Sequence, residues 1–299
     1  MTYVTPLRYP GGKARLGPWI ADLLRHNRIS GGWYVEPYAG GAGAALYLLT
    51  RGYVDHIVIN DADPVVAAFW WSIVNDTQRF LGLLQDTPVS IDEWHRQRDI
   101  HSAPDQFDAT EVGFATFFLN RTNRSGILTG GVIGGLDQTG PYKIDARFNK
   151  EALKERIELI SSMRRHISVS GYDALQLLEE IQPRLPHRSL IYLDPPYYEK
   201  GSQLYRNFYA PNDHAAIEAA VRILQTPWLV SYDNCPEIRA IYKNHETTEF
   251  SLHYSTGAGR PRATEVMFYS GIELHEEPAL RRTQVSARRR RRSAEMTTI

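Results

Sequence analysis

The segment that decides the fold begins at Trp33 and reads WYVEPYAGGAGAALYLLTRGYVDHIVINDADPVVAAFWWSIV. The apolar run 33–36 has the length of a buried strand, and the glycine-rich turn at 37–43 leads into a stretch with the spacing of a helix. A second apolar run, 56–60, is followed by DADP and by a further helical stretch. This order of strand, turn, helix and strand predicts a βαβ unit with parallel strands.

The same alternation returns after about Ile167. ISVSG is followed by the helical DALQLLEEI, the apolar SLIYLD, the helical AAIEAAVRIL, the short strand WLVSY and the extended EVMFYS. Strands and helices in this order predict an α/β protein with a doubly wound, Rossmann-like core.

Residues 76–166 break this rhythm. They contain helical stretches at 91–101, 111–120 and 149–165, and a glycine-rich segment, SGILTGGVIGG. About 90 residues are enough for a subdomain. We therefore expect a core formed by 1–75 and 167–275, interrupted by a mostly helical inserted subdomain at 76–166.

Length and composition exclude several protein classes. The chain has 299 residues, of which 42% are hydrophobic and 23% charged, unlike disordered or fibrous proteins. It has no run of the roughly 18 apolar residues that a membrane span needs, and MTYVTPLRYPGGK lacks the apolar stretch of a signal peptide. We expect a cytoplasmic protein with no membrane partner. A single cysteine, Cys235, excludes a disulfide framework and a cysteine-based zinc site, so we expect no metal and assign Cys235 to core packing.

The charged residues are unevenly distributed. Residues 279–299 contain seven arginines against one acidic residue, Glu295, although the whole chain has 34 basic and 34 acidic side chains. A segment so basic and so poor in apolar residues is predicted to be a disordered tail. It either anchors a phosphate backbone or is a solvated terminus.

The first candidate site is the turn Glu36-Pro37-Tyr38-Ala39-Gly40-Gly41-Ala42-Gly43. Its glycines allow the backbone to approach a ligand, and the next helix offers unpaired N–H groups. Asp61 ends the next strand about 20 residues later, where a carboxylate can accept the hydroxyls of a ribose. Together they indicate a nucleoside-containing cofactor, and a plain tight turn is the alternative. The chain lacks GxxxxGK[ST] and the turn does not match GxGxxG, which disfavours ATP hydrolysis and NAD binding. Asp63 is expected to cap the following helix.

The second candidate site is Asp194-Pro195-Pro196-Tyr197, at the end of SLIYLD. Ligands of open α/β sheets bind at the carboxyl ends of strands, and two prolines fix a rigid turn that directs a carboxylate and an aromatic ring into the crevice. A β-turn with an exposed Asp194 is the alternative. This tetrapeptide is the most specific signal in the chain.

Five motifs, in this order, resemble those of the Dam-type DNA adenine-N6 methyltransferases. They are LRYPGGK (7–13), VEPYAGGAG (35–43), INDADP (59–64), FFLNRTNRSG (117–126) and LDPPYY (193–198), and the resemblance spans about residues 5 to 270. It implies a Rossmann-like, S-adenosylmethionine-dependent methyltransferase core with an inserted target-recognition subdomain. It also implies a nucleoid-associated enzyme that acts on double-stranded DNA. In a restriction-modification setting, a paired restriction endonuclease would be its partner.

The resemblance further assigns a cofactor site for S-adenosylmethionine. The residues so assigned are Tyr9, Lys13, Glu36, Pro37, Ala39, Gly40, Gly41, Gly43, Asp61, Asp173 and Asp194. From the residues alone, Lys13 is equally well a solvent-exposed lysine at a helix start. Asp173 is equally well the N-cap of DALQLLEEI.

The chemistry of an exocyclic amine predicts the catalytic residues Asp194, Pro195, Pro196 and Tyr197. The N6 lone pair of adenine is delocalised into the ring, so the amine becomes a nucleophile only when acceptors hold its hydrogens. The Asp194 carboxylate and the Pro195 carbonyl suit this role, and catalysis comes from positioning and from dipoles. The target base has to leave the duplex, so that Tyr197 can stack on it. Tyr198 either assists in stacking or belongs to the core.

The inserted segment is predicted to contact DNA through Asn120, Arg121, Asn123 and Arg124, which follow a helical FATFFL. Asparagine pairs with adenine and arginine with guanine at major-groove edges. The family pattern differs at Arg124-Ser125, so a GATC target is not implied. Arg260 and Arg262 lie in a glycine- and arginine-containing loop, 255–264, that either contacts phosphates or is solvated.

Three alternative functions follow from the same motifs. N4-cytosine methylation needs the same acceptors, because any exocyclic amine does. RNA is an alternative substrate. A non-catalytic DNA-binding module with this fold is disfavoured because the glycine turn and Asp194 are both present. The sequence does not indicate an oligomeric state.

Overall fold

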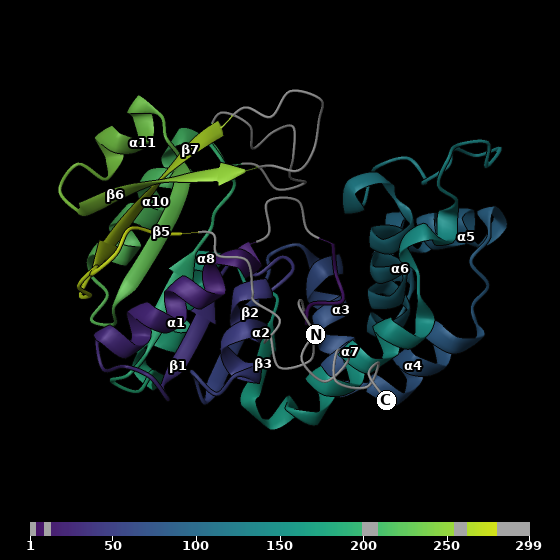
Figure 1. The fold of residues 1–299 in the computed structure, drawn as a ribbon, viewed down its shortest axis with the longest axis horizontal. Coiled ribbons are helices and arrows are strands. Elements are labelled where there is room, and N and C mark those ends of the chain that lie inside the picture. The colour runs from purple at the N-terminus through teal and green to yellow at the C-terminus, as the bar shows by residue number, and fades with distance from the viewer. Residues whose placement is uncertain (1–3, 9–12, 199–208, 254–261, 280–299) are drawn as a thin grey trace, which may run out of the picture.

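The computed structural model describes residues 4–8, 13–198, 209–253 and 262–279. These residues form a seven-stranded sheet in the order β3-β2-β1-β4-β5-β7-β6 (Figure 1). The first five strands of this order are parallel, whereas β7 runs antiparallel to both β5 and β6. The bounds are β1 Trp33–Glu36, β2 His56–Asn60, β3 Ile167–Ser170, β4 Leu190–Leu193, β5 Trp228–Asp233, β6 Glu246–His253 and β7 Arg262–Ser270. The predicted α/β, Rossmann-like fold is confirmed.

The strand order reverses next to β1. From β1 the chain continues to β2 and, after the insertion, to β3 on one side, and it then returns to β4 on the other side. Ligands of open α/β sheets bind at the carboxyl ends of strands at such a reversal. Val35 of β1 pairs with Ile191 of β4. Glu36 and Asp194 therefore lie at the same edge of the sheet, at the point of reversal.

Side chains alternate between the two faces of the central strands. In β4, Leu190 and Tyr192 join one hydrophobic cluster, whereas Ile191 and Leu193 join the other. The first cluster contains α1 (Gly17–His26), α2 (Gly43–Thr50) and α3 (Pro64–Asn75), and the second contains α8 (Ala174–Ile181), α10 (Pro211–Arg222) and α11 (Pro236–Ile241). Burial on both faces explains the uninterrupted apolar runs of these strands. Cys235 packs in the second cluster, as predicted.

The insertion contains α4 (Thr77–Asp86), α5 (Ile91–Ser102), α6 (Ala109–Thr122) and α7 (Lys150–Ser162). Figure 1 shows these helices beside α3, on the opposite side of the molecule from β6 and β7. A Cβ on Gly113 of α6 would lie 2.7 Å from the Ala68 carbonyl oxygen of α3, so only glycine allows this close approach. Phe69 of α3 stacks on Phe117 of α6 with ring centroids 6.0 Å apart. The insertion thus packs on the core through one shared hydrophobic cluster.

Sequence patterns indicated neither β6 nor the helices α1, α4 and α11. In β6, ETTEFSLH, charged and hydroxyl side chains separate the apolar residues. An edge strand of the antiparallel part of a sheet needs apolar residues on one face only, so this strand has no apolar run. Among the described residues, no helix is both long and apolar enough to cross a lipid bilayer.

Candidate active site

The glycine-rich turn between β1 and α2 is held from two sides. Gly40 has a φ of 46°, a conformation that glycine adopts without strain. The Gly40 carbonyl accepts a hydrogen bond from Trp70 Nε1 of α3 at 2.8 Å, and the Gly41 carbonyl accepts one from Thr5 Oγ1 at 2.6 Å. A Cβ on Gly43 would lie 2.6 Å from Ala14 Cβ. The turn is therefore packed tightly against the N-terminal segment and α3.

Glu36 is a buried carboxylate at the N-terminus of α2. Its Oε1 accepts the backbone N–H of Ala45 at 3.1 Å, and burial raises its pKa to about 8. A carboxylate in this position interacts favourably with the helix dipole. It also takes the place that a phosphate would take at a helix N-terminus. The turn is therefore suited to a ligand that has no phosphate at the N-terminus of α2. A positively charged ligand fits beside Glu36 better than a negatively charged one.

Asp61 follows β2 and contacts the same turn. Its Oδ2 accepts the Gly40 N–H at 2.9 Å, and its Oδ1 accepts the Asp63 N–H at 3.0 Å. Burial raises its pKa to about 6, although both hydrogen bonds oppose this shift. Each carboxylate oxygen can accept a second hydrogen bond. Asp61 can therefore accept both hydroxyls of a vicinal diol, such as that of a ribose, while it still holds the turn.

Asn60, which the sequence analysis missed, joins the ends of three strands. Its side chain is fully buried, and its Nδ2 donates to the carbonyls of Pro37 and Tyr172, each at 2.9 Å. Its Oδ1 accepts from Tyr172 N at 2.9 Å and from Ser170 Oγ at 2.8 Å. One amide thus fixes the loops that follow β1 and β3. The only signal in the sequence was a polar residue at the end of HIVIN.

Asp63 and Asp173 each cap a helix. Asp63 caps α3 through Val65 N, as predicted. Asp173 caps α8, since its Oδ1 accepts the Leu175 N–H at 2.9 Å. This is the N-cap role that the sequence left open as the alternative to cofactor binding. The Asp173 side chain is exposed, so the cap does not preclude a ligand contact.

Lys13 lies between two carboxylates at the carboxyl end of β4. Its Nζ is 3.1 Å from Asp194 Oδ1 and 2.9 Å from Glu265 Oε2, and 3.4 Å from the Tyr197 hydroxyl. The lysine side chain is only 6% exposed. Burial by itself would lower the pKa of Lys13, but the two carboxylates raise it well above its usual value. Lys13 is therefore a charged, buried lysine and not the solvent-exposed residue of the alternative interpretation.

Asp194 has one oriented oxygen and one available oxygen. Lys13 Nζ and Ser231 Oγ both contact its Oδ1, the latter at 2.8 Å, and Ser231 is in turn 2.8 Å from the Tyr192 hydroxyl. Among the described residues, none forms a hydrogen bond or ion pair with Oδ2, and the side chain is 23% exposed. Ser231 of β5 was not singled out in the sequence. The structure thus leaves one carboxylate oxygen of Asp194 accessible as a hydrogen-bond acceptor.

Tyr197 and Glu265 complete this group. The Tyr197 hydroxyl donates to Glu265 Oε1, and Tyr197 is 8% exposed. Glu265 belongs to β7 and is 1% exposed. Burial raises the pKa of Glu265, and the Lys13 ammonium opposes this shift. Pro195 and Pro196 are buried beside them, and the Tyr198 N–H donates to Asp233 Oδ1 at 2.9 Å.

The two asparagines predicted to read bases are used inside the protein. Asn120 is 2% exposed, and its Nδ2 donates to the carbonyls of Arg8 and Gly126. Asn123 is fully buried and its Nδ2 donates to the carbonyls of Ile127 and Leu128. Bidentate recognition of adenine needs a free amide N–H. In this structure neither asparagine has one, so the base-reading role predicted for them finds no support here.

Four arginines, of which Arg8 belongs to the segment 5–8, lie near one another. Arg121 Nε donates to the Arg147 carbonyl at 2.7 Å, Arg156 Nη1 donates to the Thr5 carbonyl at 3.1 Å, and Arg8 Nη1 donates to the Asn123 carbonyl at 3.1 Å. Burial and the charges of Arg8, Arg156 and Arg147 lower the pKa of Arg121 to about 9. No acidic side chain of the described residues pairs with any of the four. We call Arg8, Arg121, Arg147 and Arg156 the arginine cluster.

Several predicted residues lie wholly or partly outside the part of the chain that the structure describes. Tyr9, Arg260 and the tail from 280 onward lie outside the described residues. Arg262 begins β7, but its side chain is also outside them. Arg124 is described and exposed, at the start of a short 3-10 turn.

A comparison with models of protein families matches residues 9–256 to the D12 class N6 adenine-specific DNA methyltransferases. The chain belongs to this family. The predicted family and activity are therefore confirmed, and the family assignment favours adenine over the N4-cytosine alternative. As a member of this family, this D12 methyltransferase acts on DNA.

One curated relative of this D12 methyltransferase is the type II methyltransferase M.MjaIII of Methanocaldococcus jannaschii. It is 27% identical over 204 residues, which cover 64% of this chain and 68% of that protein. Among solved structures, the chain is similar to a putative RNA methyltransferase, PH1948, from Pyrococcus horikoshii, with 11% identity, a TM-score of 0.40 and coverage of 89% and 87% of the two chains. It is also similar to protein LPL1258 from Legionella pneumophila, with 12% identity, a TM-score of 0.34 and the same coverage.

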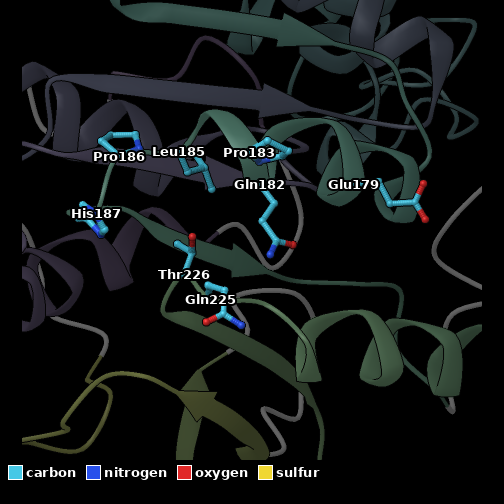
Figure 2. A pocket seen from close by; sticks show the side chains of 8 residues that line it. All are labelled: Glu179, Gln182, Pro183, Leu185, Pro186, His187, Gln225 and Thr226. Carbon is cyan, nitrogen blue, oxygen red and sulfur yellow. The ribbon is translucent and has the colours of Figure 1, made fainter.

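One cavity of this D12 methyltransferase lies away from the site. Figure 2 shows it, with a volume of about 340 Å³, lined by Glu179, Gln182, Pro183, Leu185, Pro186, His187, Gln225 and Thr226. His187 precedes β4 and Thr226 precedes β5, so the cavity lies near the amino ends of these strands. Asp194 follows the carboxyl end of β4, where ligands of this fold bind. The cavity is therefore not part of the candidate active site.

Proposed function

We propose that this D12 methyltransferase binds S-adenosylmethionine at the carboxyl ends of β1, β2 and β4, and methylates an adenine that has left the duplex stack. The observation that carries the proposal is the arrangement at Asp194. Its Oδ1 is held by Lys13 and Ser231, while its Oδ2 has no partner among the described residues. A carboxylate held in this way is preorganised to accept a hydrogen bond from an amine.

The residues present fit this cofactor. Asp61 can accept the two hydroxyls of a ribose beside the glycine turn. Asp194 and Glu265 supply negative charge, and Glu36, which takes the place of a phosphate at α2, adds a further negative charge when it loses its proton. When bound, the cofactor supplies a methyl group on a positively charged sulfonium. We assign the pocket to Lys13, Glu36, Pro37, Ala39, Gly40, Gly41, Gly43, Asp61, Asp173 and Asp194, and extend the assignment to Tyr9.

Asp194 and Pro195 activate the amine. With its Oδ2, Asp194 accepts one N6 hydrogen, and the Pro195 carbonyl accepts the other. These hydrogen bonds localise the nitrogen lone pair, and the two acceptors then stabilise the positive charge that develops on N6. The rigid Pro195-Pro196 turn keeps the acceptors in place, so catalysis comes mainly from positioning.

The burial of this group requires the base to leave the duplex. Asp194 is 23% exposed and Tyr197 is 8% exposed, so a stacked base pair cannot reach them. Unpairing and unstacking a base costs a few kcal/mol. Stacking of the base on an aromatic ring contributes roughly 1–3 kcal/mol, which is comparable. Tyr197, fixed by Lys13 and Glu265, is the ring that we assign to this stacking.

The duplex would be held by the arginine cluster and the inserted helices 76–166, which we propose as the target-recognition part. Four guanidinium groups without an acidic partner among the described residues favour an anionic ligand. A phosphate backbone relieves their mutual repulsion, as it does for other DNA-binding arginines. Arg124, which is exposed, remains the candidate for contact with a base edge, and Arg260 and Arg262 remain candidates for phosphate contacts.

The direct test is methylation of unmethylated duplex DNA with labelled S-adenosylmethionine, followed by chromatography of the nucleosides. We expect the label in N6-methyladenine, and sequencing of modified positions then gives the target site. Label in N4-methylcytosine, or in RNA but not DNA, contradicts the proposal. The relative from Methanocaldococcus jannaschii is a type II methyltransferase, and by analogy we propose a restriction-modification setting, which a site shared with a paired endonuclease would support.

A further inference from the structure

We infer that Glu265 is a positioning residue that shares Lys13 with Asp194, so that the charge of Lys13 does not cancel the negative charge that the site presents to the reacting amine. The inference rests on the function proposed above. Glu265 Oε2 is 2.9 Å from Lys13 Nζ and Asp194 Oδ1 is 3.1 Å from it. One ammonium thus lies between two carboxylates that come from distant parts of the chain.

The burial of Glu265 calls for a functional reason. Its side chain is 1% exposed, and transfer of a carboxylate out of water is costly unless it is paired and hydrogen-bonded. Lys13 and Asp194 alone would already form a neutral pair. A second buried carboxylate adds a desolvation cost that a purely structural site would avoid. Within these three groups, Glu265 turns a neutral pair into a set with an excess of one negative charge.

The excess negative charge is complementary to the positive charge that methyl transfer moves through the site. In methyl transfer, the amine lone pair forms the new nitrogen–carbon bond, and the sulfur keeps the electrons of the bond that breaks. One positive charge therefore passes from the sulfonium to N6 and leaves as a proton to water. The excess of one negative charge on Lys13, Asp194 and Glu265 stabilises the positive charge before and after this transfer. If Lys13 were paired with Asp194 alone, its charge would cancel that of the acceptor.

Glu265 also accepts a hydrogen bond, and the effect of this bond can be tested separately from the effect of the charge. Its Oε1 accepts the Tyr197 hydroxyl, which fixes the ring at the end of the DPPY turn. Glutamine in this position keeps an oxygen acceptor for Tyr197 but carries no charge. The variant Glu265→Gln therefore tests the charge while it leaves the hydrogen bond to Tyr197 in place.

The experiment is calorimetric titration with S-adenosylmethionine and with S-adenosylhomocysteine, its neutral thioether product, without DNA and without turnover. We expect the wild-type protein to prefer the sulfonium, and Glu265→Gln to reduce this preference by about threefold to tenfold, as for removal of one charge at short range in a partly screened site. Lys13→Gln removes the cation and is expected to change the preference in the opposite direction. Glu249→Gln, at an exposed residue of β6 that pairs with Arg239, is the matched control and should have no effect.

The possible results separate a failure of the role inferred for Glu265 from a failure of the proposed function. An equal decrease of both affinities in Glu265→Gln, or shifts of the same sign in Glu265→Gln and Lys13→Gln, overturns the inference and leaves a structural role. If Glu265→Gln does not fold, the double variant Lys13→Gln/Glu265→Gln replaces it in the test. The double variant removes one positive and one negative charge, so its preference for the sulfonium over the thioether is expected to lie near that of the wild type. A wild-type protein that binds neither ligand contradicts the proposed function itself.

Discussion

Asn120 and Arg8 form a reciprocal pair of hydrogen bonds between segments 112 positions apart in the sequence. Asn120 Oδ1 accepts the backbone N–H of Arg8 at 2.7 Å, and Asn120 Nδ2 donates to the Arg8 carbonyl at 2.8 Å. The asparagine side chain thus serves the N-terminal segment as a neighbouring strand would. Because the same segment carries Thr5, which holds the glycine turn, this pair links the inserted helices to the cofactor side of the site.

Replacement of Asn120 by alanine is expected to destabilise the fold. The change leaves buried backbone groups of Arg8 and Gly126 without partners, which costs about 1–3 kcal/mol. Urea unfolding measures this decrease in stability, with Asn75→Ala as the control, because the Asn75 amide makes an exposed contact within its own helix. An unchanged midpoint, together with an altered target sequence, would instead support the base-reading role predicted for Asn120.

Asp194→Ala is expected to lower kcat for methyl transfer by at least about 100-fold, because it removes the acceptor that activates the amine. The fold should persist, since Lys13 keeps its second carboxylate, Glu265. Ser231→Ala, which removes one of the two groups that orient Asp194 Oδ1, should cause a smaller decrease. Single-turnover methylation and thermal melting measure both effects. Full activity of Asp194→Ala refutes the assignment of this carboxylate.

Affinity for S-adenosylmethionine is expected to rise between pH 6 and pH 8. Burial raises the pKa of Glu36 to about 8 and that of Asp61 to about 6. A positively charged ligand prefers both groups ionised, so binding releases protons at neutral pH and strengthens as these carboxyls lose them. Calorimetry across this range measures the slope.

Glu36→Gln provides the control for this pH dependence. It should remove the part of the slope near pH 8, while any titration of the ligand itself stays the same in both proteins. The folded-state pKa of Glu36 lies above its unfolded value, so the wild-type fold loses stability as pH rises toward 8. The variant should therefore melt at a higher temperature than the wild type near pH 7.5. Parallel slopes for the two proteins would exclude Glu36 from the binding equilibrium.

Local patterns predicted the parts of the site that lie at strand ends. Asp61 and Asp194 follow apolar runs, and parallel strands bring such ends to one edge of the sheet. Glu265 and Asn60 were missed because their roles depend on partners more than a hundred positions away. The structural role of Asn123 was missed for a related reason, since an amide that satisfies buried carbonyls has the same sequence signature as one that reads a base. Its helix neighbours are buried on most sides, and only tertiary structure shows this.

The arginine cluster yields a prediction that separates DNA binding from stability. Arg156→Gln removes one guanidinium from a group whose charges repel each other, as the lowered pKa of Arg121 shows. If Arg156 neutralises a phosphate of the duplex, the slope of log affinity against log salt concentration should become shallower by about 0.9 in the variant. The melting temperature should stay the same or rise, because repulsion is relieved and the variant gives up only the hydrogen bond to the Thr5 carbonyl.

Arg184→Gln is the control for this measurement, since Arg184 is exposed and pairs with Glu180 beside the distant cavity. Like Arg156→Gln, this variant removes one positive charge, but the charge that it removes lies far from the arginine cluster. We therefore expect Arg184→Gln to keep the salt slope of the wild type. Weaker DNA binding by Arg156→Gln with an unchanged salt slope would mean that Arg156 acts only through the N-terminal segment that it holds.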